Sequence, residues 1–220
     1  FRMAEAQRID QEKNRVFTDI GYIDYDYLIL AMGADTNYFG MKNIMENSIP
    51  MKSVSEALFI RNKIISNYER AINIADLEKR KSLMNVVIVG GGPTGVELAG
   101  AMAELRNKVF PKDYPQLNFD NMKVVLIEMG PSLLAGMSAS SGQKAKEYLE
   151  SLKVDVLLNT AVENYDGLNV IINGEEKLKT NTLLWAAGIA PNGIEGIVDT
   201  QKFKNGRLLV NEYNLVHNSK

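Results

Sequence analysis

Residues 85–103 read NVVIVGGGPTGVELAGAMA, and this stretch decides the fold of the chain. Its β-branched run predicts a buried strand, the glycines predict a tight turn, and the small residues that follow predict a helix packed closely on a sheet. The glycines match a G-x-G-x-x-G pattern, in which the backbone approaches a dinucleotide pyrophosphate and the positive end of the helix faces its charge. The residues expected to bind this ligand are Gly90, Gly91, Gly92, Pro93, Thr94 and Gly95.

A second strand, which ends in an acid, follows this helix. Residues 123–128 read KVVLIE, so Glu128 stands where a ribose-binding carboxylate belongs. The interval from Gly90 to Glu128 exceeds the usual gap of roughly 20 residues. Two prolines within residues 106–122 predict an inserted loop, which would lengthen the interval and leave the strand end in place. The alternative for Glu128 is a solvated carboxylate at a strand end.

Glu128 also indicates which dinucleotide is bound. A carboxylate can accept hydrogen bonds from the 2′ and 3′ hydroxyls of the NAD ribose. The 2′-phosphate of NADP would instead meet a like charge, with a repulsion on the order of 4 kcal/mol at 4 Å and an effective dielectric of 20. The next residues, Met129, Gly130 and Pro131, supply no arginine or lysine for that phosphate. The sequence therefore predicts NAD(H) rather than NADP(H).

The composition excludes several other classes of protein. The chain has 220 residues, and its hydrophobic content of 45% is ample for a buried core. A net charge of −2 gives no basic footprint for nucleic acid. Cysteine is absent and His217 is the single histidine, so we expect no disulfide, no thiolate relay and no metal site. No apolar run reaches the length of about 18 residues that a transmembrane helix requires.

The remaining pattern predicts a three-layer α/β fold. Helical spacing covers residues 53–80 with a capping box of Ser53 and Glu56, and a second helix is expected over residues 140–152. A buried strand is expected over residues 25–33. Further short strands are expected at residues 154–158, 162–165, 169–172 and 182–188. The order of elements is β-α-β-α-β, then a β-meander formed by residues 162–165 and 169–172, then a closing strand. This order is that of a Rossmann-like nucleotide-binding domain with an antiparallel crossover.

Four stretches together give the chain a resemblance to a known family. They read YDYLILAMGADTNYFG (25–40), IVGGGPTGVELAGAMAEL (88–105), VVLIE (124–128) and LLWAAGIAPN (183–192). In this order they resemble the type II NADH dehydrogenases, or NADH:quinone oxidoreductases, which are flavoproteins of the two-dinucleotide-binding, pyridine nucleotide-disulfide oxidoreductase type. The resemblance runs over nearly the whole chain and is more specific than any single motif.

The resemblance implies a domain organisation and two cofactors. In that family an NADH-binding domain is inserted into a flavin domain. Residues 1–50 and 190–220 are then partial FAD-domain segments that flank an NADH-binding domain of residues 51–189, and the chain is expected to be an internal fragment. The cofactors implied are NAD(H) and, in the full-length protein, FAD. Hydride passes from NADH to the flavin and electrons then pass to quinone, whereas the fragment alone is expected to bind NADH without turnover.

Further site residues rest on the same resemblance. Glu97 is implied to be catalytic, near the junction of nicotinamide and flavin; the alternative is that it only favours the positive end of its helix. Ala187 and Gly188, like Met32 and Gly33, resemble the family's turns at cofactor edges, although Met32 stands where threonine is usual. For each turn the alternative is a strand that simply ends at glycine.

The resemblance also implies partners and a location. The whole protein is expected to meet quinone and a membrane surface through regions outside this chain, as a peripheral protein on the cytoplasmic side of the cell membrane. The chain itself is expected to be soluble and to self-associate through residues 1–50 and 190–220, which makes a homo-oligomer possible. Two alternatives stay open: the NADH domain of a ferredoxin-reductase-like or apoptosis-inducing-factor-like flavoprotein, and a stand-alone nucleotide-binding module.

Overall fold

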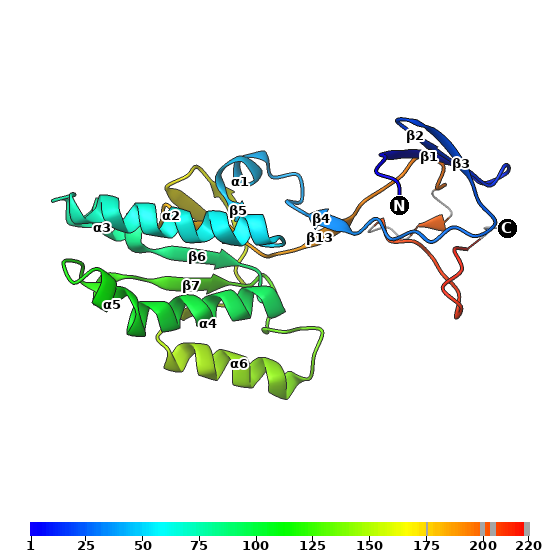
Figure 1. Cartoon of the computed structure of the whole chain (residues 1–220). Coiled ribbons are helices and arrows are strands. Elements are labelled where there is room, and N and C mark those ends of the chain that lie inside the picture. Colours follow the sequence, from blue (N-terminus) through cyan, green and yellow to red (C-terminus); the bar gives the residue numbers. More distant parts are fainter. Residues whose placement is uncertain (175, 199–200, 203–205, 218–220) are drawn as a thin grey trace. The chain divides into compact units, whose positions relative to one another are not determined.

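The chain forms two compact units in a computed structural model that describes residues 1–174, 176–198, 201–202 and 206–217 (Figure 1). One unit comprises Phe1–Asp35 and Ile189–Lys220, and the other comprises Thr36–Gly188. The first division between compact units falls after Asp35, whereas the family resemblance implied a domain boundary after residue 50. The reason is that the strand Ile49–Pro50 pairs with the strand Leu183–Trp185, which fixes this segment to the sheet of the larger unit.

The larger unit contains helices and strands in alternation. In chain order they are α1 (Lys42–Asn47), β5 (Ile49–Pro50), α2 (Val54–Ile72), α3 (Leu77–Met84), β6 (Val86–Val89), α4 (Pro93–Lys108), α5 (Phe110–Asp113), the 3₁₀ helix η1 (Phe119–Asn121), β7 (Val124–Ile127), α6 (Ala139–Ser151), β8 (Asp155–Leu157), β9 (Val162–Tyr165), β10 (Asn169–Ile172), β11 (Glu176–Lys179) and β12 (Leu183–Trp185).

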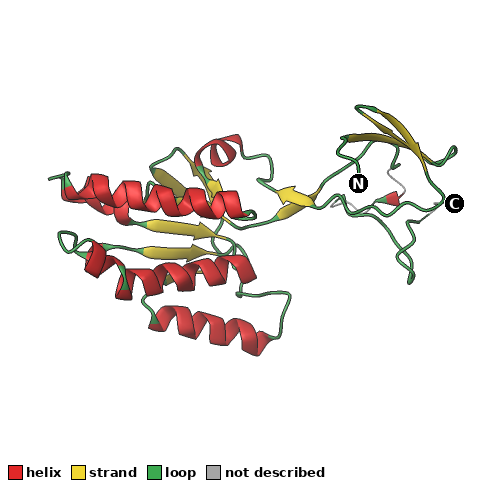
Figure 2. Ribbon diagram, in the orientation of Figure 1, coloured by secondary structure: helices red, strands yellow, loops and turns green. Residues whose placement is uncertain are grey.

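A five-stranded parallel sheet lies at the centre of this unit (Figure 2). Its strands lie in the order β5-β12-β6-β7-β8, and every neighbouring pair is parallel. Every residue of β6 and β7 is buried, as parallel strands are when both faces of the sheet are covered. The motif strands of the sequence therefore occupy the middle of the sheet.

Two hydrophobic cores make this unit three layers thick. On one face, α2, α4 and α6 pack against alternate residues of the central strands, such as Ile88 and Leu126. On the other face, α1 and the antiparallel meander β9-β10-β11 cover the intervening residues, such as Val87 and Val125. The expected Rossmann-like α/β class with a β-meander is confirmed.

The helical stretch expected over residues 53–80 is two helices. The capping box is confirmed, because the Ser53 hydroxyl accepts the Glu56 N–H at 3.2 Å and the Glu56 carboxylate accepts the Ser53 N–H at 2.7 Å. However, α2 ends at Ile72, and α3 starts anew behind Asp76, whose carboxylate accepts two backbone N–H groups. These hydrogen bonds lower the pKa of Asp76.

The inserted segment, residues 106–122, is not the plain loop that its prolines predicted. It contains α5 and η1, and Phe110 and Phe119 pack around the buried Tyr68 with ring centroids 4.9 and 5.5 Å away. At the start of this segment, the buried Arg106 donates hydrogen bonds to three backbone carbonyl oxygens. One lies between η1 and β7, and two lie directly after α6. These oxygens belong to Met122, Leu152 and Lys153.

The smaller unit contains an antiparallel sheet of β1 (Ala6–Asp10), β2 (Arg15–Thr18) and β3 (Gly21–Asp24). The buried strand expected over residues 25–33 is wrong: no strand covers these residues, and Tyr27 and Ile29 are 94% and 88% exposed. Its apolar run has no neighbouring strand to pair with in the part of the chain that is described. A short ribbon of β4 (Ala34–Thr36) and β13 (Ile189–Pro191) lies where the chain passes between units.

One further feature of the helices concerns membranes. Within the described residues, no helix combines the length and the apolar character that crossing a bilayer would require.

Candidate functional site

Gly90 shapes the turn at the carboxyl end of β6. Its φ of 112° is one that L side chains rarely adopt, and its N–H donates to the carbonyl oxygen of Ile127 at 2.8 Å. A Cβ here would lie 2.5 Å from the carbonyl oxygen of Ala186 and 2.7 Å from the Cα of Ala187. The turn is therefore held between the ends of β7 and β12, with no room for a side chain.

Two other glycines have different tasks at the start of α4. A Cβ on Gly95 would overlap the carbonyl oxygen of Gly90, so glycine lets the helix begin against the turn. A Cβ on Gly92 would meet no protein atom within 4 Å. Gly92 is the N-cap of α4 and Pro93 follows it, so no side chain caps the helix. The positive end of α4 is therefore open to a phosphate group.

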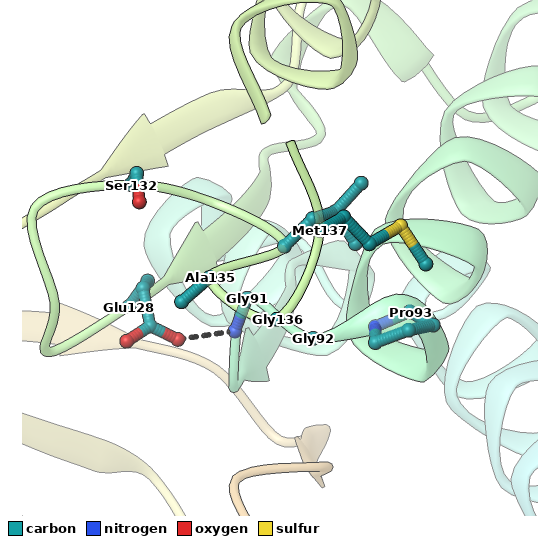
Figure 3. A pocket seen from close by; sticks show the side chains of 9 residues that line it. Gly91, Gly92, Pro93, Glu128, Ser132, Ala135, Gly136 and Met137 are labelled. Carbon is teal, nitrogen blue, oxygen red and sulfur yellow. Dashed lines mark hydrogen bonds between the residues drawn. The ribbon is translucent and has the colours of Figure 1, made fainter. Parts of the chain in front are cut away.

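Glu128, the residue directly after β7, reaches back to the glycine turn (Figure 3). One carboxylate oxygen accepts the N–H of Gly91 and the other accepts the N–H of Gly130, each at 2.6 Å. A side chain on Gly91 would crowd both Glu128 and Leu133, with approaches of 2.7 to 2.9 Å. Glycine at position 91 therefore serves packing as well as the turn, and the carboxylate is fixed in one orientation.

The loop after Glu128 closes a pocket of about 340 Å³ beside the turn (Figure 3). The loop is tied down because the N–H of Leu134, a residue with a left-handed φ of 51°, donates to the carbonyl oxygen of Gly91 at 2.8 Å. Leu133 is buried in the core, whereas Leu134 lines the pocket. The lining residues are Gly91, Gly92, Pro93, Glu128, Ser132, Leu134, Ala135, Gly136 and Met137.

This pocket, called here the Glu128 pocket, has a clear chemical character. Its walls are mostly apolar, and its one ionisable side chain is the carboxylate of Glu128. None of the lining residues is lysine or arginine. Such a pocket suits a neutral, hydroxyl-bearing group next to a phosphate, and it disfavours a second phosphate at the carboxylate.

The sequence motif did not identify all of these residues. Ser132, Ala135, Gly136 and Met137 carry no motif, because the loop that presents them is shaped by its contacts with the glycine turn and α6. The nearest signal in the sequence is the pair of glycines that frames the loop, Gly130 and Gly136.

The other predicted site residues lie in three places. Ala187 and Gly188 follow β12; Ala187 adjoins the glycine turn at Gly90, whereas Gly188 lies against Phe39. Thr94 and Glu97, in the first two turns of α4, are exposed and are not among the residues that line the Glu128 pocket. Met32 and Gly33 belong to the smaller unit and line a pocket of about 170 Å³ there.

A parallel sheet with a glycine turn and an uncapped helix at its carboxyl edge defines a Rossmann-like, dinucleotide-binding class of domain. The family model for pyridine nucleotide-disulphide oxidoreductases matches residues 1–218. The chain therefore belongs to the pyridine nucleotide-disulphide oxidoreductase family.

Individual relatives point to one branch of that family. A type II NADH:quinone oxidoreductase of Mycobacterium tuberculosis is 33% identical over 170 residues, which cover 76% of this chain and 37% of the relative. An external alternative NADH-ubiquinone oxidoreductase of Yarrowia lipolytica mitochondria is 31% identical. The alignment covers 97% of this chain and 40% of the relative's length. The solved structure of NDH2 from Plasmodium falciparum in complex with NADH aligns with a TM-score of 0.77 and 29% identity, covering 86% of this chain and 41% of that one. The chain thus spans about two fifths of the length of these relatives.

Proposed function

We propose that the larger unit binds NADH, with its pyrophosphate at the start of α4 and its adenosine ribose at Glu128. The observation that carries this proposal is the fixed carboxylate beside an uncapped helix N-terminus. Each carboxylate oxygen accepts one backbone N–H and keeps a lone pair for a further donor. The two ribose hydroxyls are donors of the right number and kind. The relatives named as NADH oxidoreductases support the same ligand.

For the whole protein we propose an FAD-dependent NADH:quinone oxidoreductase. FAD, when bound, would supply the acceptor for the hydride of NADH and the donor of electrons to quinone, and the protein's share is binding and orientation. In this chain, residues 36–188 serve NADH, and the smaller unit provides part of the FAD domain, with Met32 and Gly33 facing that cofactor. The names of the quinone-reducing relatives support this proposal. Because quinones dissolve in the lipid bilayer, we propose that the whole protein meets a membrane surface.

Glu97 is the residue that we propose to act nearest the reacting ring. It lies on the exposed side of α4, one turn after the uncapped start of the helix. Its carboxylate can hydrogen-bond the carboxamide of the nicotinamide or influence the local field. In the whole protein, Glu97→Gln is expected to slow flavin reduction in a single turnover while NADH affinity stays unchanged. An unchanged rate of flavin reduction would mean that Glu97 only interacts favourably with the positive end of α4.

The role of Glu128 is tested by removing its charge. Glu128→Gln is expected to weaken NADH binding by about tenfold, because an amide nitrogen would then face one of the two N–H donors. The same variant should bind NADPH more tightly than the parent chain does, because the repulsion of the 2′-phosphate is gone. Calorimetric titration of both nucleotides measures the two affinities.

The matched control is Glu163→Gln, which removes the same charge from an exposed position on β9. It should leave both affinities unchanged. If Glu128→Gln kept the parent's preference for NADH over NADPH, the proposed role of Glu128 in binding the ribose would be contradicted.

A further inference from the structure

Phe39 is an aromatic residue held in an unusual position at the edge of the larger unit. The residue is 61% exposed, and its φ of 51° lies in the left-handed region that bulky residues rarely adopt. The side-chain oxygen of Asn37 accepts the Phe39 N–H at 2.8 Å, which stabilises this conformation. An exposed ring on a strained backbone adds little to the core, so its position calls for another explanation.

The segment that carries Phe39 is fixed to the end of β12. The N–H of Asn37 donates to the carbonyl oxygen of Gly188 at 3.0 Å, and the indole N–H of Trp185 donates to the carbonyl oxygen of Asn37 at 2.8 Å. Tyr38 stacks on the buried Trp185 with ring centroids 6.0 Å apart. These contacts hold Phe39 beside the turn that follows the strand.

The ring of Phe39 covers Gly188. A Cβ at position 188 would lie 2.9 Å from the Cζ of Phe39 and 3.4 Å from its Cε2, so the ring packs directly on a residue without a side chain. Gly188 in turn follows Ala187, whose Cα lies against the glycine turn at Gly90. The glycine turn, the end of β12 and the ring of Phe39 therefore form one continuous surface at the carboxyl edge of the sheet.

The order of the strands decides which half of the dinucleotide meets this surface. Glu128 follows β7 on one side of β6, and Gly188 follows β12 on the other side. If adenosine lies at Glu128 and the pyrophosphate at the glycine turn, the nicotinamide half continues toward β12. Two strand spacings, about 10 Å, separate β7 from β12. This step rests on the function proposed above.

We propose that Phe39 is a binding residue for the nicotinamide half of NADH, with its ring packed against that half at Gly188. The dihydronicotinamide of NADH is not aromatic, but it is a flat, conjugated ring whose face can pack against the apolar face of an aromatic side chain. The left-handed backbone and the Asn37 hydrogen bond keep the ring at this edge before the ligand arrives, so that little side-chain freedom is lost on binding.

The test compares NADH with ADP-ribose, which lacks the nicotinamide, by calorimetric titration of the full chain. Phe39→Asn removes the ring while asparagine tolerates the left-handed backbone, and Phe39→Tyr keeps an aromatic ring. We expect Phe39→Asn to bind NADH roughly five- to tenfold more weakly, with ADP-ribose affinity unchanged. Phe39→Tyr should bind both ligands as the parent chain does.

Two outcomes would overturn this proposal. One is a Phe39→Asn variant with the parent's NADH affinity. The other is an equal loss for NADH and ADP-ribose, which would mean that Phe39 only supports the fold of the site. A parent chain that binds neither ligand would instead contradict the proposed function itself, so the two failures can be told apart.

Discussion

Gly92→Ala is expected to weaken NADH binding by roughly five- to 150-fold while the chain stays folded. The new methyl group meets no protein atom within 4 Å, and the φ of −73° at this residue suits alanine. The methyl group would instead stand where the pyrophosphate approaches the start of α4, at a steric cost of about 1–3 kcal/mol. Isothermal titration with NADH and a thermal unfolding curve measure the two effects.

The matched control is Gly100→Ala in the same helix. Its methyl group would come no closer than 3.8 Å to Leu149, an ordinary contact, and alanine favours a helix by about 1 kcal/mol over glycine. NADH affinity should not change in this variant. As alanine is a poorer N-cap than glycine, Gly92→Ala should lower Tm only slightly, by about 4 °C or less. Unaltered NADH binding by Gly92→Ala would mean that these glycines only form a turn.

Arg106→Ala is expected to give the largest loss of stability, about 3 kcal/mol in the free energy of unfolding. The buried guanidinium of Arg106 donates to three carbonyl oxygens, which hold the end of α4 to the end of α6 and to the chain entering β7. Without it, carbonyls at the helix end lose their partner. For a chain of this size the expected fall in Tm is about 6–12 °C.

Lys108→Ala serves as the comparison for Arg106. Lys108 lies at the same end of α4, but it is exposed and makes only a surface ion pair with Glu104 at 3.2 Å. Its removal should cost no more than about 0.5 kcal/mol. Equal Tm values for the two variants would contradict the bridging role of Arg106.

The features predicted from sequence were those with local causes. The glycine turn is specified by residues that need positive φ or close approach, and the Ser53–Glu56 capping box by a four-residue pattern. The meander strands at residues 162–165 and 169–172 have the expected bounds. Alternating apolar residues mark the strands, and a tight turn separates one strand from the other. Glu128 could be placed because a buried strand precedes it directly.

The features that sequence could not give depend on distant contacts. Residues 25–33 have the composition of a buried strand, yet a strand also needs a partner for its backbone, and composition does not supply one. The prolines of segment 106–122 predict a loop. The contacts of Phe110 and Phe119 with Tyr68, which pack this segment against α2, cannot be predicted from the local sequence. Phe39 belongs to the same class, since its place beside Gly188 joins segments far apart in the chain.

The central claim is that the larger unit binds NADH in preference to NADPH. Its most direct test is a titration of the parent chain with each nucleotide, in which binding is detected by energy transfer from Trp185 to the reduced nicotinamide. Trp185 is the single tryptophan and is buried at the end of β12. It lies two residues before Ala187, which contacts the glycine turn. We expect saturable quenching by NADH, with NADPH binding at least tenfold more weakly because of Glu128. Equal affinity for the two nucleotides, or no saturable binding of NADH, would contradict the account.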